Sequence, residues 1–366
     1  ATAVAVVSLV VAGISSGGSD DADEPLRRLD LQIDMRPSPV GIFHRVDISR
    51  DGERMVYVGG GPRGTQLWLR DFSQLEARPL PDTDRALSPA FSPDGESVAF
   101  VSDAGGGRRE LRTVAVEGGP SVALSDSLVD LGSLAWGDDG FIYYDTGFEQ
   151  DGFSRIPERG GTPELMTVPI TPAIGISWHF PTDALPDGRG VLFYSHNPAQ
   201  VAVLDLRTRE WRPLVDGVGA VYAPSGHLLW VDGTGTLRAA PFDLETLEIT
   251  GPQTPLAEDV RTLANGGADL SLSDSGTLLY ATGSGTSASS LGFMDESGAH
   301  EPSEDPWQAF FIDLALSPDG RTVVASIPDF DTDQLLLWAR GIEGGRATQV
   351  TFSGRADSPA FSPDGS

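Results

Sequence analysis

Short apolar segments recur along the chain, and each begins just after a turn that ends in glycine. Residues 91–101 give one copy, FSPDGESVAFV, in which the turn FSPDG precedes the apolar-rich segment SVAFV. In such a turn Pro presets the backbone, Asp bonds the backbone ahead of it, and Gly adopts a positive φ without steric cost. The turn glycines are Gly52, Gly95, Gly140, Gly188, Gly226, Gly276, Gly320 and Gly365, at intervals of 43, 45, 48, 38, 50, 44 and 45 residues.

Each repeat of about 45 residues contains four segments with a strand pattern. Four antiparallel strands in a unit of this length are the blade of a β-propeller, whereas a set of β-sandwiches would not keep a constant four-strand unit. We therefore predict an all-β fold, a β-propeller of four-stranded antiparallel blades over residues 29–366. We expect about seven blades, with six or eight also compatible, and a truncated repeat at residues 361–366. Residues 29–36 (LDLQIDMR) are expected to form an extra strand that closes the ring by joining the last blade.

Residues 1–28 differ from the repeats in composition. Residues 1–14 are uncharged and largely apolar, which predicts the tail of a transmembrane helix, with a trimmed signal peptide as the alternative. Residues 15–28 read as an acidic flexible linker. We therefore expect an extracytoplasmic (periplasmic or extracellular) protein anchored by a single N-terminal helix, the membrane being contacted through that helix alone.

The charge and composition of the chain exclude several classes of partner and site. The chain has 25 basic and 53 acidic residues, a net charge of −28, and every basic residue is Arg. This argues against nucleic acid as a partner, because phosphate contacts need clustered basic side chains. The lack of Cys excludes disulfides, cysteine nucleophiles and thiolate metal sites. We expect no cofactor, no metal site and no catalytic residue in this stretch.

Aromatic and histidine side chains just ahead of the turns are the candidate binding residues. Loops at this end of a propeller commonly meet ligands, and aromatic side chains there suit a protein or peptide partner. The alternative is that these rings pack between blades. The predicted residues are His44, Trp178, His179, Trp307 and Phe310.

The turn FSPDG, the alternating strand after it and the second strand of the QLWLRD kind resemble the TolB-type, WD-repeat-like propeller repeat. The order of segments, from the apolar tail through LDLQIDMR to LALSPDGRTVVAS, resembles the extracytoplasmic region of bacterial eukaryotic-like serine/threonine protein kinases. That resemblance implies a non-catalytic sensor and protein-interaction propeller, with a kinase domain upstream. The alternatives are a periplasmic TolB-like scaffold and the propeller of a prolyl-oligopeptidase-type serine peptidase.

Overall fold

The computed structural model describes the chain in two compact units, one within Ala1–Ser38 and Ile42–Gly285 and the other within Pro39–Gly41 and Thr286–Ser366. The described residues are 5–11, 27–33, 44–105, 108–125, 133–145, 152–167, 178–195, 200–262, 267–282, 289–290, 293–294, 300–301, 305, 307–309, 311, 313–329, 334–354, 356 and 359–362.

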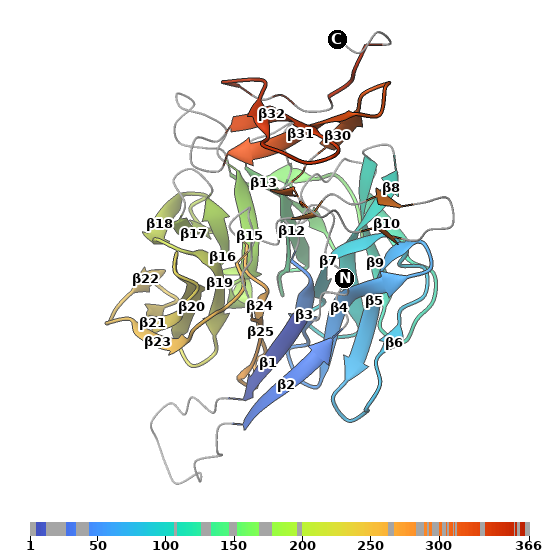
Figure 1. Ribbon diagram of the computed structural model, residues 1–366. Helices are drawn as coiled ribbons and strands as arrows, with labels where there is room; N and C mark the ends of the chain where they lie inside the picture. Colours follow the sequence, from blue (N-terminus) through green and yellow to red (C-terminus); the bar gives the residue numbers. More distant parts are fainter. Residues whose placement is uncertain are drawn as a thin grey trace. The chain divides into compact units, whose positions relative to one another are not determined.

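The first unit is a ring of six antiparallel blades, counted over its described residues (Figure 1). The first three blades are β3 to β6 (Val46–Ile48, Arg54–Gly61, Gly64–Asp71, Arg78–Pro79), β7 to β10 (Ala86–Phe91, Ser97–Gly105, Arg108–Ala115, Val122–Ser125) and β11 to β14 (Leu134–Trp136, Phe141–Asp145, Phe153–Pro157, Glu164–Leu165). The fourth and fifth are β15 to β18 (His179–Ala184, Gly190–Ser195, Gln200–Asp205, Trp211–Val215) and β19 to β23 (Val218–Ala223, His227–Val231, Leu237–Asp243, Glu248–Ile249, Thr254–Ala257).

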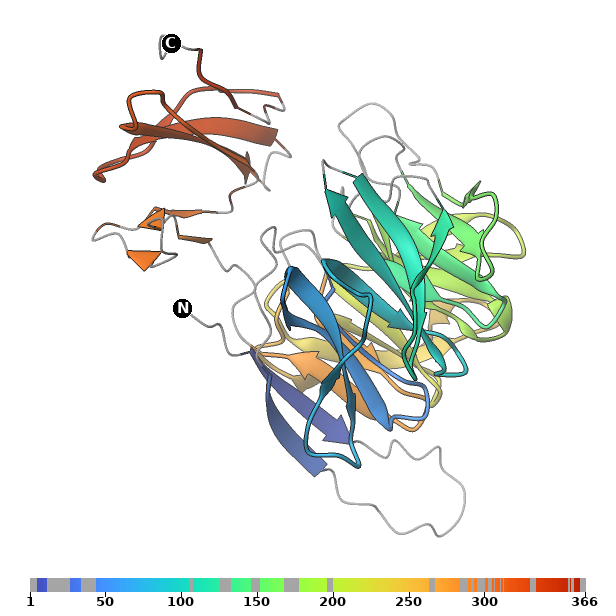
Figure 2. The ribbon, with the colours of Figure 1, turned by 90° about the vertical axis from the view of Figure 1, so that its right-hand side faces the viewer.

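The sixth blade joins the two ends of the first unit. Its strands, from the inside outwards, are β24 (Leu270–Leu272), β25 (Thr277–Ala281), β1 (Ala5–Val11) and β2 (Arg27–Ile33). Figure 2 shows the dark-blue β1 and β2 continuing the sheet of the orange strands. The inner strands then neighbour one another in a closed circle, in the order β3, β7, β11, β15, β19, β24 and back to β3.

These findings confirm the propeller and refine its blade number. The ring closes at six blades because β1 and β2 complete the sixth one. The seventh repeat forms a separate four-stranded sheet in the second unit, β30 to β33 (Asp313–Leu316, Thr322–Asp329, Gln334–Gly341, Thr348–Gln349). The strand predicted at residues 29–36 is found at Arg27–Ile33, as the outermost strand of the sixth blade, where it pairs with β1.

Residues 5–11 correct the expectation of a helix at the N-terminus. They form strand β1, whose backbone pairs with β25 on one side and β2 on the other. A strand that is central in its sheet satisfies its backbone groups as completely as a helix does, so an apolar run of this length suits either. Among the residues that the structure describes, none forms a helix with the length and apolar character needed to span a bilayer. The predicted linker lies outside the described residues up to residue 26.

The repeated turn has the predicted chemistry. In the second blade Ser92 Oγ donates a hydrogen bond to Asp94 Oδ1 at 2.6 Å, and the N–H of Glu96 donates to the same oxygen at 3.0 Å. Gly95 follows with φ of 69°. The same Ser–Asp pair recurs at Ser49 with Asp51 and at Ser317 with Asp319, so the turn is a self-contained unit of the repeat.

Adjacent blades pack through apolar side chains on both faces of each sheet. Along β4, Met55, Val56 and Val58 are all buried, although successive side chains of a strand point to opposite faces. Val56 and Val58 belong to a cluster that includes Phe91 and Phe100 of the next blade. Strand β4 is therefore packed on both faces, which holds its pairing partner, the inner strand β3, in place.

Candidate binding site in the central cavity

The inner strands of the six blades surround a cavity of about 350 Å³. All six of them, β3, β7, β11, β15, β19 and β24, contribute lining residues, so the cavity lies where the blades converge. A smaller cavity of about 40 Å³ shares part of this lining. His44, Leu134, Thr182, Val221 and Leu270 border both.

One position in the repeat places a side chain against this cavity in every blade. It is the residue five places before the turn glycine, as Asp47 is to Gly52. In order of the blades these residues are Asp47, Ala90, Ala135, Asp183, Val221 and Ser271, and all six line the cavity. Three of these residues are polar, and each of the three forms a hydrogen bond with the neighbouring blade.

The polar side chains accept hydrogen bonds from the backbone of the next inner strand. The N–H of Phe91 donates to Asp47 Oδ2 at 2.6 Å, and the N–H of Tyr222 donates to Asp183 Oδ2 at 2.8 Å. The same bond closes the ring, since the N–H of Ile48 donates to Ser271 Oγ at 3.2 Å. Inner strands have no further strand to pair with on this side, so these bonds satisfy backbone donors that are buried.

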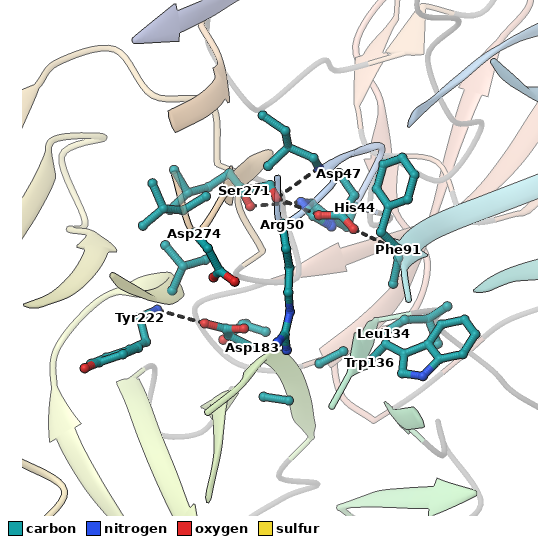
Figure 3. A pocket seen from close by; sticks show the side chains of 18 of the residues that line it. His44, Asp47, Arg50, Phe91, Leu134, Trp136, Asp183, Tyr222, Ser271 and Asp274 are labelled. Carbon is teal, nitrogen blue, oxygen red and sulfur yellow. Dashed lines mark hydrogen bonds between the residues drawn. The ribbon is translucent and has the colours of Figure 1, made fainter. Parts of the chain in front are cut away.

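Ser271 also connects two of these positions directly. Its hydroxyl donates to Asp47 Oδ1 at 2.5 Å while its oxygen accepts from Ile48 (Figure 3). Asp47 thus accepts bonds from the second blade and from the sixth. The result is a chain of hydrogen bonds that crosses the seam between the last blade and the first.

Burial raises the pKa of Asp47 and of Asp183. For Asp47 the hydrogen bonds from Ser271 and Phe91 work against that rise without cancelling it. For Asp183 burial raises the pKa to about 7, although the bond from Tyr222 and the positive charge of Arg50 favour the ionised form. The charge of Asp183 therefore changes near neutral pH.

Arg50 is the cationic side chain of this group. Figure 3 shows it running across the cavity toward Asp183, and its Nη1 lies 3.9 Å from Asp138 Oδ2. The Arg50 side chain is 35% exposed, so it borders both the cavity and solvent. Asp274, which also lines the cavity, donates its backbone N–H to the carbonyl of Arg50 at 2.8 Å. The cavity is therefore lined by three carboxylates, one arginine and one histidine, so its acidic side chains outnumber its basic ones.

A buried ion pair next to the cavity joins the first blade to the sixth. Arg45 Nη2 lies 2.6 Å from Asp269 Oδ2, with side chains 3% and 0% exposed. Arg45 also donates its Nε to Oδ2 at 3.3 Å and its backbone N–H to Oδ1 at 3.1 Å. Burial works to raise the pKa of Asp269, but the charge and hydrogen bonds of Arg45 hold it below the ordinary range.

The structure separates the five residues predicted from the sequence. His44 lines the cavity, with its Nε2 3.2 Å from the carbonyl oxygen of Leu270. Trp178 packs edge-on against Phe180, and neither it nor His179 lines the cavity. Trp307 belongs to the second unit. Phe310 lies outside the described residues.

His179 is a core residue rather than a surface one. It is fully buried, its Nδ1 lies 2.9 Å from Thr167 Oγ1, and its ring contacts Phe193 and Trp211. Burial lowers its pKa to about 4, which keeps the imidazole neutral. Packing between blades, the alternative considered from the sequence, describes this residue.

Sequence reasoning missed Asp47, Arg50, Asp183 and Ser271. The acidic residues of the turns, such as Asp51 and Asp94, have a local structural role. The signal that could have found the cavity residues is the position five before the turn glycine, which is Asp, Asp and Ser in three blades and a small or apolar residue in the other three. Within the described part of the chain, no cluster of three or more His, Asp or Glu side chains is arranged to hold a metal ion.

The fold and the cavity together define a six-bladed β-propeller with a polar centre. Its fold is like that of TolB: the structure of a putative TolB from Agrobacterium tumefaciens aligns with a TM-score of 0.54 at 16% identity, over 76% of this chain and 98% of that one. TolB from Acinetobacter baumannii aligns with a TM-score of 0.45 at 15% identity, over 85% of this chain and 67% of that one.

Sequence comparison gives a short match. The Tol-Pal system protein TolB of Thiobacillus denitrificans is 36% identical over 69 residues, which are 19% of this chain and 16% of that protein. No family model matches the sequence. The similarity to solved structures is therefore a similarity of fold.

Proposed function

We propose that this chain is a non-catalytic, extracytoplasmic scaffold propeller that binds a partner protein at its central cavity. The observation that carries the proposal is the cavity itself, in which Asp47, Asp183 and Asp274 gather around a single arginine. A partner segment with a basic side chain matches this balance of charge. The net charge of −28 would attract such a segment over longer range at low salt.

The named relatives favour the scaffold over the sensor of a receptor kinase. The sequence match is to a protein named for the Tol-Pal system, and the aligned structure is a putative TolB. The kinase-tethered sensor rests on the order of segments, and it remains a second candidate on that ground. The coding sequence on either side of residues 1–366 distinguishes the two, because the sensor requires a kinase domain upstream.

A charge-matched pair of peptides tests the proposal. The probe is a fluorescein-labelled nonapeptide with two central arginines, compared with the same peptide carrying glutamates at those places. Fluorescence anisotropy reports binding at low salt and at about pH 8.5, where Asp183 is ionised because its pKa is about 7. We expect the arginine peptide to bind, and Asp183→Asn to weaken its binding about tenfold, the size of a charge-assisted hydrogen bond. The matched control is Glu76→Gln, which removes an exposed carboxylate that does not line the cavity.

Two results would count against the proposal. One is equal binding of the arginine and glutamate peptides. The other is an equal affinity of Asp183→Asn and Glu76→Gln for the arginine peptide, which would place binding elsewhere on the acidic surface.

A further inference from the structure

One position of the repeated turn carries a basic side chain in the first blade and in no other blade of the ring. It is the position two before the turn glycine, and in blade order its residues are Arg50, Pro93, Asp138, Pro186, Pro224 and Asp274. Proline suits this place because it presets the backbone of the turn. Arg50 does not have this advantage, yet its side chain lines the cavity. We therefore look for its role in the cavity rather than in the turn.

Arg50 reaches past the second blade toward the third and the fourth. Its Nη1 lies 3.9 Å from Asp138 Oδ2, in the turn of the third blade. Figure 3 shows the side chain crossing the cavity toward Asp183 of the fourth blade. The positive charge of Arg50 works to lower the pKa of Asp183, against the larger effect of burial. The guanidinium thus faces carboxylates of two other blades.

Arg50 is held less tightly than the buried arginine of the same blade. Arg45 Nη2 lies 2.6 Å from Asp269 Oδ2, with the Arg45 side chain 3% exposed. The distance from Arg50 to Asp138 exceeds the roughly 2.7–2.9 Å of a charge-assisted hydrogen bond, and the Arg50 side chain is 35% exposed. A partly exposed ion pair of this kind contributes little to stability. Arg50 can therefore leave its place at a small cost.

The carboxylates that Arg50 faces are fixed by backbone groups. Asp138 accepts the N–H of Asp187 at 3.0 Å and the N–H of Gly188 at 3.2 Å. Asp183 accepts the N–H of Tyr222 at 2.8 Å. These bonds do not involve Arg50, so they persist when its side chain moves. A second guanidinium can then take the same place without any rearrangement of the carboxylates.

We propose that Arg50 is an internal occupant of the cation subsite beside Asp183, and that an arginine of the partner takes this subsite by displacing it. This inference rests on the proposed function, in which the cavity binds a basic segment. The two guanidinium groups compete for one carboxylate, so the affinity for the partner is reduced to the fraction of molecules in which the subsite is free. Arg50 therefore makes the cavity selective, because only a segment that binds Asp183 more strongly than Arg50 does can enter.

Fluorescence anisotropy on the full chain tests the displacement, with the arginine nonapeptide described above at low salt and about pH 8.5. Arg50→Gln removes the competing guanidinium and should tighten binding about tenfold, the factor expected if Arg50 fills the subsite in about nine molecules of ten. The matched control is Arg54→Gln, which changes the net charge equally. Arg54 pairs with Asp51 at 3.4 Å and does not line the cavity, so this variant should stay within about twofold of the native affinity.

A double variant separates competition from general attraction by negative charge. Asp183→Asn removes the charge for which the two guanidinium groups compete. Adding Arg50→Gln to Asp183→Asn should therefore change the affinity by less than about twofold, because the two residues act through one interaction. A general electrostatic effect would instead give the same gain with and without the Asp183 charge.

Three results would overturn the displacement. Arg50→Gln would bind the arginine peptide no more tightly than Arg54→Gln, or it would gain equally in the Asp183→Asn background. Weaker binding by Arg50→Gln would make Arg50 a contact for the partner rather than a competitor. Each of these leaves the proposed function standing if Asp183→Asn still weakens binding relative to Glu76→Gln. Equal affinities of Asp183→Asn and Glu76→Gln would instead overturn the proposed function and this inference together.

Discussion

Replacing Asp269 with asparagine should destabilise the ring at the seam between its first and last blades. The substitution keeps the shape of the side chain but removes the charge that faces Arg45, whose side chain is 3% exposed. A guanidinium left buried without its counter-charge destabilises a protein by about 3–5 kcal/mol. With a urea m-value of about 3 kcal/mol per molar, the unfolding midpoint should fall by about 1–1.7 M.

Urea unfolding followed by tryptophan fluorescence measures this shift, since Trp230 is buried in the same ring. The matched control is Glu245→Gln, which breaks the exposed pair of Glu245 with Arg207 at 2.8 Å. An exposed pair contributes about 0–1 kcal/mol, so the control should stay near the native midpoint. The double variant Arg45→Met with Asp269→Asn removes the stranded charge and should recover part of the loss.

The pH dependence of the unfolding free energy provides a second test of the Arg45–Asp269 pair. The pKa of Asp269 is held below its ordinary range, so the stability from this pair is present above the unfolded value of about 3.9 and is lost as the pH falls through the folded value. The native protein and Asp269→Asn should therefore converge in stability under acid. A midpoint of Asp269→Asn equal to that of Glu245→Gln at pH 7 would refute the reasoning.

Three further predictions use the same unfolding assay. Ser271→Ala removes the hydroxyl that bonds the N–H of Ile48 and Oδ1 of Asp47, so it should destabilise the ring by about 1–3 kcal/mol. An unchanged free energy of unfolding would contradict a stabilising role for this chain of hydrogen bonds. Gly140→Ala should destabilise by about 1–2 kcal/mol because φ is 79° with nothing near the added carbon, whereas Gly233→Ala, equally open but without a positive φ, should not. The pKa of His179 is about 4 against 6.5 for the free group, so stability should fall as pH drops from 6.5 to 4, and His179→Gln should flatten that fall.

The repeat could be predicted from the sequence because its turn is local. Ser92, Asp94 and Gly95 bond within a few residues of one another, so their spacing along the chain already contains the geometry. The blade number could not be obtained in this way. It depends on which strands complete the last sheet, and the period of the repeat is the same whether residues 5–11 join the ring or not.

The site was harder to predict than the fold. Asp47 and Asp183 are ordinary acidic residues in the sequence, and they become a site only because six strands converge. The aromatic residues chosen from the sequence lie close to the turns. Closeness to a turn does not decide whether an aromatic side chain points to the axis of the propeller or packs between blades. His179 points between blades and His44 lies at the cavity.

The pairing of β1 with β25 in the sixth blade also has a kinetic consequence for folding during biosynthesis. β1 is made before any other described strand, yet its partner β25 is made last among the strands of the ring, so synthesis must proceed from Val11 to Thr277 before the two can pair. At a synthesis rate of about 5–20 residues per second, the wait is roughly 13–50 s. During that time an apolar strand lacks its partner β25, so the nascent chain should be most prone to aggregation before residue 281 emerges, and a chaperone that covers extended segments should raise its yield.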